Sequence, residues 1–273
     1  QNYATSLDYA LKSMELLSSK VTSPVLKADC SNLASIVYFR LSDFVNALEY
    51  SKMSLSIARE LADRERMSYA LNTIAGISLA SRQPEEGEKY VLEAIKICEE
   101  QHDSVKLSVR LGMASEIYHA MGREEESLEY ARRGYDVSMQ LGSPDKAAVR
   151  LVQMAAASNS LGRLEEAEKC LREAIPVLEQ CGNLQSWAIA GNQMGDIMLE
   201  KGDSASAACY FEKSLKVFES RGDAYNMSHS HYGLGRALMP ADPSLAANHI
   251  MKYTQIRDSL YNSEMKRGLN EYH

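Results

Sequence analysis

The chain has little glycine and proline, with 15 Gly and 6 Pro among 273 residues. Proteins built from many strands or from long loops need more of these turn residues. Hydrophobic residues make up 45% and charged residues 25%, which is the composition of an ordinary folded chain and not of a disordered one. The shortage of turn residues therefore predicts an all-α protein with short connections between its helices.

An excess of positive charge is also lacking. Lys and Arg number 30 against 37 Asp and Glu, which gives a net charge of −7. This is the wrong sign for a surface that neutralises phosphates, so we expect this segment to contact no nucleic acid. No run of apolar residues approaches the roughly 18 that a membrane-spanning helix needs, and the N-terminus does not look like a signal peptide.

The five cysteines form an odd and scattered set without a CxxC pair: Cys30, Cys98, Cys170, Cys181 and Cys209. Such a set predicts neither a disulfide framework nor a zinc site. We expect most of them to be small buried hydrophobic residues. Reduced cysteines slightly favour the cytosol.

Catalytic sequence motifs are lacking as well. The sequence contains no GxxxxGK[ST], HExxH or GxSxG. Gly233-Leu234-Gly235 begins a GxG pattern, but Leu238 stands where its last glycine should be. Because the segment is expected inside a helix, we interpret these glycines as helix-packing residues. We therefore expect no enzyme activity, no catalytic residue and no cofactor.

Two groups of polar residues have structural interpretations that we favour. His229 and His231 are two residues apart, so on a helix they point to nearly opposite sides and cannot share a metal ion. Runs of glutamate are expected in the first turns of helices: Glu85-Glu86, Glu124-Glu125-Glu126 and Glu165-Glu166. The helix dipole stabilises negative charge at these positions. We favour this interpretation over pairs of catalytic carboxylates. No metal site is therefore predicted.

What the sequence does contain is a repeat with a period of 40 residues. Residues that cap helix N-termini recur at this interval: Ser23, Asp63, Asp103, Ser143, Asn183 and Asp223. Their side chains can accept a hydrogen bond from a backbone N–H of the first helical turn. Pro24 and Pro144 follow two of the caps, where a missing N–H costs nothing. Turn residues recur midway through each unit, so we predict two helices of about four to five turns per unit.

Three columns of small residues repeat with the same period. One of them lies twelve residues after the caps: Ser35, Ala75, Ser115, Ala155, Gly195 and Gly235. The other two begin at Ala47 and Ser54. Large apolar residues fill the columns between them at spacings of three or four, as in amphipathic helices. The small columns predict places where helices approach each other closely.

This pattern resembles the tetratricopeptide repeat (TPR). The small columns, together with Tyr38 and Tyr118, match signature positions of that family, and the resemblance covers roughly residues 23–262. It implies a right-handed α-α superhelix, a solenoid of helix-turn-helix repeats. The period departs from the usual 34 residues. The usual proline late in the second helix is absent, whereas Pro176 falls mid-helix and should lose the bond to Arg172 and bend that helix.

The repeat count divides the chain into three parts. Residues 1–22 are expected to be the second helix of a truncated first repeat, residues 23–262 six repeats, and residues 263–273 the start of an exit or connector helix. A repeat cannot bury its apolar face alone, so we expect more chain upstream. The exit helix is expected either to cap the last repeat or to continue, and its Leu260, Met265 and Leu269 are where we would place a homodimer contact.

The family resemblance places a ligand-binding groove on the first helices of the repeats. Its positions select Asn32, Phe39, Arg40, Asn72, Glu116, His119, Asn159, Asn192, Asp196, Tyr232 and Arg236. Recurring asparagines suit an extended peptide, because one amide can both donate to and accept from a peptide backbone. The alternative is that asparagine is merely tolerated on a solvated face. Since Glu116 and Asp196 are acidic, we expect a basic or uncharged peptide or protein segment as the partner.

The C-terminal residues 253–261, followed by Glu264, Leu269 and Tyr272, resemble the end of sensor arrays in membrane-anchored bacterial regulators. In that group, repeats outside the membrane precede a connector, a transmembrane helix and a histidine kinase or helix-turn-helix domain. The resemblance implies the periplasmic or extracytoplasmic input domain of a signalling or transcriptional regulator, which reaches the membrane only through a downstream helix. The alternative is a free-standing cytosolic adaptor, which the unpaired cysteines fit better.

Overall fold

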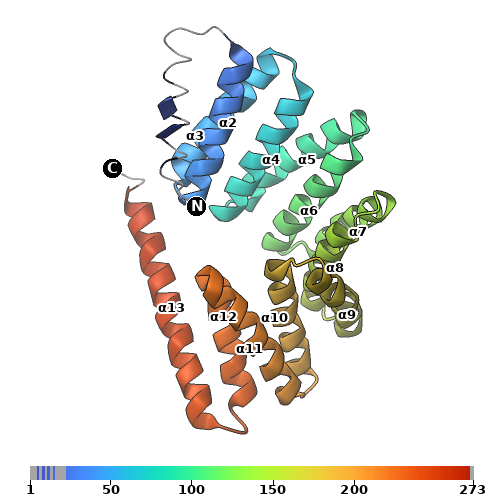
Figure 1. Ribbon diagram of the computed structural model, residues 1–273, viewed down its shortest axis with the longest axis vertical. Helices are drawn as coiled ribbons and strands as arrows, with labels where there is room; N and C mark the ends of the chain where they lie inside the picture. Colours follow the sequence, from blue (N-terminus) through green and yellow to red (C-terminus); the bar gives the residue numbers. More distant parts are fainter. Residues whose placement is uncertain (1–4, 6–7, 10, 13–14, 16–22, 271–273) are drawn as a thin grey trace. The chain divides into compact units, whose positions relative to one another are not determined.

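The computed structural model describes residues 5, 8–9, 11–12, 15 and 23–270, with side chains up to residue 262. This part of the chain folds into helices and contains no strand (Figure 1). The helix bounds are Pro24–Arg40 (α2), Phe44–Glu60 (α3), Arg64–Ala80 (α4), Pro84–Glu100 (α5), Ser104–Ala120 (α6), Glu124–Gln140 (α7), Pro144–Ser160 (α8), Leu164–Gln180 (α9), Leu184–Glu200 (α10), Ser204–Arg221 (α11), Ala224–Leu238 (α12) and Pro243–Asn270 (α13). The helix predicted within residues 1–22 lies largely outside the described residues.

The first helix of every described pair begins at the 40-residue interval that the caps predict. Five of the six cap side chains accept a hydrogen bond from the backbone three residues on, as Asp63 Oδ1 does from Arg66 N at 3.0 Å. Ser143 is the N-cap of α8, but its side chain makes no such bond, so that part of the prediction is wrong. Its backbone φ is −111°, whereas the other five caps lie between −94° and −79°.

Ten turns from α2 through α12 contain one residue with left-handed backbone conformation, at intervals of 20. These residues are Ser42, Ala62, Arg82, His102, Gly122, Gly142, Gly162, Gly182, Gly202 and Gly222. After α2, the N–H of Ser42 donates to Phe39 O and the N–H of Asp43 donates to Tyr38 O, both at 2.9 Å. This pair of bonds satisfies the last carbonyls of the helix. Because Asp43 also caps α3, one short turn ends one helix and starts the next, which explains why the chain needs so little glycine and proline.

Replacing Ala62 with glycine should stabilise the protein by about 1 kcal/mol, because a side chain with φ of +50° is strained and glycine is not. Replacing Gly162, at φ +73°, with alanine should have the opposite sign and cost about 1–2 kcal/mol. Urea denaturation of the two variants beside the unchanged protein measures both effects. Changes of the same sign in the free energy of unfolding for the two substitutions would contradict the assignment of backbone strain to these turns.

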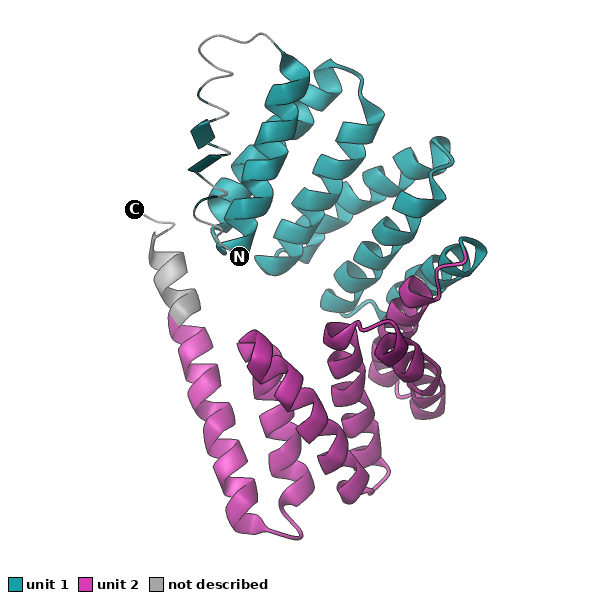
Figure 2. Cartoon of the chain, viewed as in Figure 1, with its two compact units in different colours: residues 1–141 teal, residues 142–273 magenta. Residues whose placement is uncertain are grey.

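The helices form two compact units, residues 1–141 and residues 142–273 (Figure 2). In unit 1, the first helices α2, α4 and α6 pack against one another, and each packs on its own second helix. Its core includes the fully buried Leu71, Ile74 and Leu111. In unit 2, α8, α10 and α12 are arranged in the same way around a core that includes Phe211 and Phe218.

The small columns lie where helices approach closely. Ser35 is fully buried, and its hydroxyl donates to the carbonyl oxygen of Ala47 at 2.7 Å. In unit 2 the ring of Phe211 lies against Gly195 of α10 and Gly233 of α12. A Cβ atom at these two positions would come within 2.7 Å and 2.4 Å of the ring. The absence of side chains there is what admits the phenylalanine ring.

Other predictions have mixed outcomes. Pro176 lies inside α9, as predicted, and α13 has 28 residues and runs well past the length of its partner α12. All five cysteines are free, but only Cys98 and Cys170 are buried. The prediction that most would be buried is wrong: Cys181 sits in the turn after α9 and Cys209 lies on the solvent-facing side of α11. None of the helices in the described chain is both long and apolar enough to span a bilayer.

Candidate functional site

Unit 1 contains a cavity of ≈ 450 Å³ between its first helices, and we call it the α4 pocket. It is lined by Ile36, Phe39, Arg40, Asn72, Thr73, Gly76, Leu79, Ala80, Met113 and Glu116. These residues belong to α2, α4 and α6, so three successive repeats contribute to one site. Four predicted groove residues meet here: Phe39, Arg40, Asn72 and Glu116.

The pocket exists because α4 carries small residues where its neighbours carry large ones. Gly76 occupies the same repeat position as Ile36 of α2 and Glu116 of α6. A Cβ atom at Gly76 would be 3.4 Å from Met113 Cε, which is ordinary van der Waals contact, so a methyl group fits at this position beside Met113. The apolar side chains of Ile36, Phe39 and Met113 line the pocket beside it.

Three polar groups in the pocket determine what it can bind. The side-chain oxygen Oδ1 of Asn72 is buried and has no hydrogen-bond partner in the described structure. Such an acceptor is costly unless an N–H or O–H donor reaches it. Arg40 is exposed and forms no ion pair with any described residue, and Glu116 is an exposed carboxylate on α6. The site therefore combines an apolar cavity with an unsatisfied acceptor and two charges of opposite sign.

Some pocket residues were missed from the sequence, and some predicted residues lie beside the pocket. Thr73 follows the predicted groove residue Asn72, and Met113 follows Gly112, which occupies the same repeat position as Asn72. That adjacency is the signal that could have found them. Asn32 lies next to the pocket, where its Oδ1 accepts from Thr73 Oγ1 at 3.4 Å. His119 is exposed on α6, and its Nδ1 is 2.7 Å from Glu124 Oε2, outside the pocket lining.

The candidate residues of unit 2 mostly contact one another. Asn192 is only 2% exposed: its amide nitrogen donates to Asn226 O at 3.4 Å, and its oxygen accepts from Ser230 Oγ at 2.8 Å. The amide is thus engaged within the fold, and Asn192 does not line the α4 pocket. Two of the other candidates form ion pairs, Asp196 with His229 at 2.7 Å and Arg236 with Glu200 at 3.4 Å. The ring of Tyr232 packs against that of Tyr253, with the ring centroids 5.1 Å apart. Asn159 is half-buried in α8.

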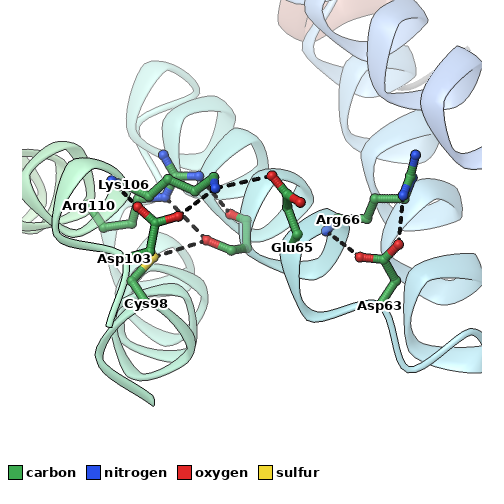
Figure 3. A network of polar contacts seen from close by, with 8 residues as sticks. Asp63, Glu65, Arg66, Cys98, Asp103, Lys106 and Arg110 are labelled. Atoms are coloured by element: carbon green, nitrogen blue, oxygen red, sulfur yellow. Dashed lines mark hydrogen bonds and ion pairs between the residues drawn. The ribbon is translucent and has the colours of Figure 1, made fainter. Parts of the chain in front are cut away.

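A polar network connects the N-terminal halves of α4 and α6 (Figure 3). Lys106 of α6 binds Glu65 of α4 at 3.1 Å and Asp103 at 2.5 Å. Arg66 binds Asp63 within α4 at 2.6 Å and Asp29 of α2 at 2.8 Å. Hydrogen bonds from the backbone and side chain of Arg66 lower the pKa of Asp63. Because the Arg66–Asp29 and Lys106–Glu65 bonds cross from repeat to repeat, they help to fix the register of the three helices that line the pocket.

Arg110 is the buried member of the same network. It is 4% exposed, its Nε lies 3.4 Å from Ser68 Oγ, and its guanidinium lies 5.4 Å from the centre of the Tyr69 ring. Burial lowers the pKa of this guanidinium. The hydroxyl of Ser68 also lies 3.3 Å from Cys98 Sγ. These contacts join α5 and α6 to α4.

Comparison with known proteins identifies the repeat. A tetratricopeptide-repeat model matches residues 145–220, and a model of anaphase-promoting complex subunit 5 matches residues 1–121. No curated protein matches the chain. The helix pairs and these matches define an α-solenoid of helix-turn-helix repeats. Residues 145–220 match the tetratricopeptide repeat, as the sequence pattern predicted, and the described helices form a TPR-like solenoid.

Solved structures share this fold at low sequence identity. The apo form of RapI has a TM-score of 0.80 at 12% identity and matches 96% of this chain and 94% of its own. A Rap protein complexed with Competence and Sporulation Factor has a TM-score of 0.72 at 14% identity, over 99% of this chain and 81% of its own. The apo form of the quorum sensor NprR from B. thuringiensis has a TM-score of 0.63 at 14% identity, over 97% and 79%.

Proposed function

We propose that this chain binds an extended peptide or protein segment across the α4 pocket. The observation that carries the proposal is the buried oxygen of Asn72, which has no partner in the described structure and lines an apolar cavity. A backbone N–H of an extended segment supplies the missing donor, while an apolar side chain fills the cavity. A purely apolar small molecule would leave the oxygen of Asn72 unsatisfied.

The proposed role is binding without catalysis. The polar side chains of the pocket are an arginine, an asparagine, a threonine and a glutamate. Catalysis by a nucleophile requires a base within hydrogen-bond reach of it, and none of the contacts described for Thr73 joins it to a base: its hydroxyl bonds Asn32 and Tyr69 O. Binding chemistry therefore accounts for the residues in the pocket.

Within this function, we favour the input domain of a bacterial signalling or transcriptional regulator. The support is the sequence resemblance of residues 253–272 to such arrays, together with the shared fold of the quorum sensor NprR and of a Rap protein that was solved with Competence and Sporulation Factor. The proposed location is extracytoplasmic. A free-standing cytosolic adaptor is the alternative, which the exposed free thiols of Cys181 and Cys209 suit. The gene sequence downstream of His273 distinguishes the two roles. A membrane span with a kinase or DNA-binding domain supports the input domain of a regulator, and an early stop supports the free-standing adaptor.

Filling the pocket should abolish binding. Peptides would first be selected from a phage-displayed library of random twelve-residue peptides on the unchanged 273-residue chain, and their affinity measured by fluorescence polarisation. Gly76→Leu puts a side chain into the cavity while replacing a helix-interior glycine with a better helix former, so the fold is kept. We expect affinity to fall by at least about tenfold, because the buried contact of one apolar side chain is lost.

Removing the unsatisfied acceptor should have a smaller effect in the same assay. Asn72→Ala is expected to weaken the selected peptides by about three- to tenfold, the value of one hydrogen bond. Asn159→Ala is the matched control, because Asn159 is the asparagine on the first helix of unit 2 and lies outside the pocket. Failure of any peptide to be enriched, or equal affinity for Gly76→Leu, would contradict the proposed function.

A further inference from the structure

Arg40 differs from the other arginines of unit 1 in having no partner within the described residues. The other eight each interact with another group of the chain: Arg59, Arg64, Arg66, Arg82, Arg110, Arg123, Arg132 and Arg133. Arg59, for example, binds the carboxylate of Glu93 on the neighbouring second helix at 2.8 Å. The guanidinium of Arg40 is exposed and makes no hydrogen bond or ion pair in the described chain, so its charge is available to a ligand.

The position of this free cation is at the α4 pocket. Arg40 is the last residue of α2, and it lines the pocket together with Ile36, which lies one turn earlier on the same face of the helix. The next two repeats carry Ala80 and Ala120 at the same repeat position. The cation is therefore particular to this pocket and is not a feature that every repeat of unit 1 shares.

The carboxylates of the predicted groove do not compete for this role. Glu116 is the one acidic residue in the pocket lining, and it already has an interaction partner within the chain, so we assign no ligand group to its charge. Asp196 lies in unit 2, and its Oδ2 is 2.7 Å from His229 Nε2. The sequence-based expectation of a basic or uncharged guest depended on these two carboxylates, and both are engaged within the chain.

The guanidinium of Arg40 suits a carboxylate better than a phosphate. Its N–H donors form a planar fork that matches the two oxygens of a carboxylate. Phosphorylated residues are recognised by clusters of arginines, whereas Arg40 is the only arginine or lysine in the pocket lining. In an extended peptide, side chains two residues apart lie on the same side at a distance of roughly 7 Å. The carboxylate therefore belongs close in sequence to the apolar residue that enters the cavity.

We propose that the α4 pocket selects extended peptides in which a carboxylate lies within two residues of a large apolar side chain. The inference rests on the proposed function. The apolar side chain enters the cavity beside Gly76, Asn72 binds the peptide backbone, and the carboxylate pairs with Arg40. That carboxylate belongs to an aspartate or glutamate side chain or to the C-terminus of the peptide, because a guanidinium binds both in the same way.

Peptide selection in two formats tests the proposal and distinguishes the two sources of the carboxylate. The random twelve-residue library is displayed once with the peptide C-terminus fused to the coat protein and once with the C-terminus free. If a side chain supplies the carboxylate, both formats should enrich an acidic residue within two positions of a large apolar residue. If the chain end supplies it, the free format alone should enrich apolar residues in the last positions. On Arg40→Glu, the acidic residues should be replaced by basic ones, or the preference for a free C-terminus should disappear.

Fluorescence polarisation with synthetic pairs measures the same interaction directly. Each enriched peptide is compared with a partner that lacks the carboxylate, in which Glu is replaced by Gln or the C-terminus is amidated. The unchanged chain should bind the carboxylate form about two- to fivefold more tightly, as expected for an exposed ion pair. Arg40→Gln should bind the two forms equally. Because Arg40 is exposed and has no partner in the described chain, this substitution should leave the fold intact.

A matched control separates the ion pair from the general effect of charge. Arg221 is the last residue of α11, as Arg40 is of α2, and it is exposed and lies outside the pocket. Arg221→Gln should keep the full preference for the carboxylate form. Peptides that lose binding to Gly76→Leu but show no preference for a carboxylate on the unchanged chain, or keep that preference on Arg40→Gln, would overturn this inference and leave the proposed function standing. If Gly76→Leu binds them as well as the unchanged chain does, the proposed function itself fails.

Discussion

Truncation of Phe211 to alanine should destabilise unit 2 by about 3–5 kcal/mol, the range for a fully buried aromatic ring. Phe211 is 0% exposed, and its ring fills the space left by Gly195 of α10 and Gly233 of α12. It also lies 6.2 Å, between ring centres, from His229. The ring is therefore shared by three helices, α10, α11 and α12, and its loss leaves a cavity between two repeats.

The single tryptophan of the chain makes this measurement specific to unit 2. Trp187 lies in α10 and is half-buried, so its fluorescence follows urea unfolding of this unit. Phe39→Ala is the control, because Phe39 lies in unit 1 and should leave the tryptophan transition unmoved. Gly233→Ala is expected to shift the transition in the same direction as Phe211→Ala, by about 1–3 kcal/mol, because the added methyl group overlaps the ring. A transition that stays within about 1 kcal/mol in the Phe211 variant would show that the ring does not hold the repeats together.

Acidification should destabilise unit 2 through a buried pair of histidines. His231 of α12 is 2% exposed, and its Nδ1 lies 2.9 Å from Nδ1 of His249 in α13. Burial, together with the nearby charges of His249 and Lys252, lowers the pKa of His231 from the ordinary value of 6.5 to about 4. Burial also lowers the pKa of His249, against the opposing effect of Glu212 and Glu219 on α11.

The direction of this pH effect on stability depends on whether the folded or the unfolded chain binds a proton more readily at His231. The unfolded chain takes up a proton at His231 near pH 6.5, whereas the folded chain does so only near pH 4. The contribution to stability is therefore fully present above pH 6.5 and is lost as the pH falls towards 4, up to about 3 kcal/mol. Urea denaturation at a series of pH values measures this slope.

Replacing His231 with glutamine removes the titrating ring and keeps a polar side chain, so it isolates this contribution. The variant should show a smaller loss of stability between pH 6.5 and 4 than the unchanged protein. The carboxylates of the chain titrate in both proteins and cancel in the comparison. Parallel stability curves for the two proteins would exclude the histidine pair as the source of the pH dependence.

The period and the helix boundaries could be predicted from the sequence because they depend on local signals. Asp63 caps α4 through a backbone group only three residues away, and Ser35 touches Ala47 within one repeat. These contacts repeat every 40 residues, so the pattern is visible without knowledge of the packing. The left-handed turns at Ser42 and Ala62 were less visible, because no glycine marks them.

The binding residues could be predicted only in part, because the availability of a side chain depends on the next repeat. Asn72 and Asn192 occupy the same repeat position. Asn72 keeps a free buried oxygen, whereas Asn192 is satisfied by Asn226 and Ser230, which are 34 and 38 residues further along the chain. Nothing near Asn192 in the sequence signals this contact. The cavity likewise requires Gly76 of α4 to face Met113 of α6, a pairing of side chains from two repeats.

The most direct test of the account follows the methyl group of Met113 by NMR while a selected peptide is added to the 273-residue chain. Met113 lines the α4 pocket, and Met194 is buried at 1% exposure in the core of unit 2. The account predicts a saturable shift of the Met113 methyl signal, an unmoved Met194 signal, and loss of the shift in Gly76→Leu. Saturable binding that leaves Met113 unmoved would contradict the placement of the ligand in this pocket.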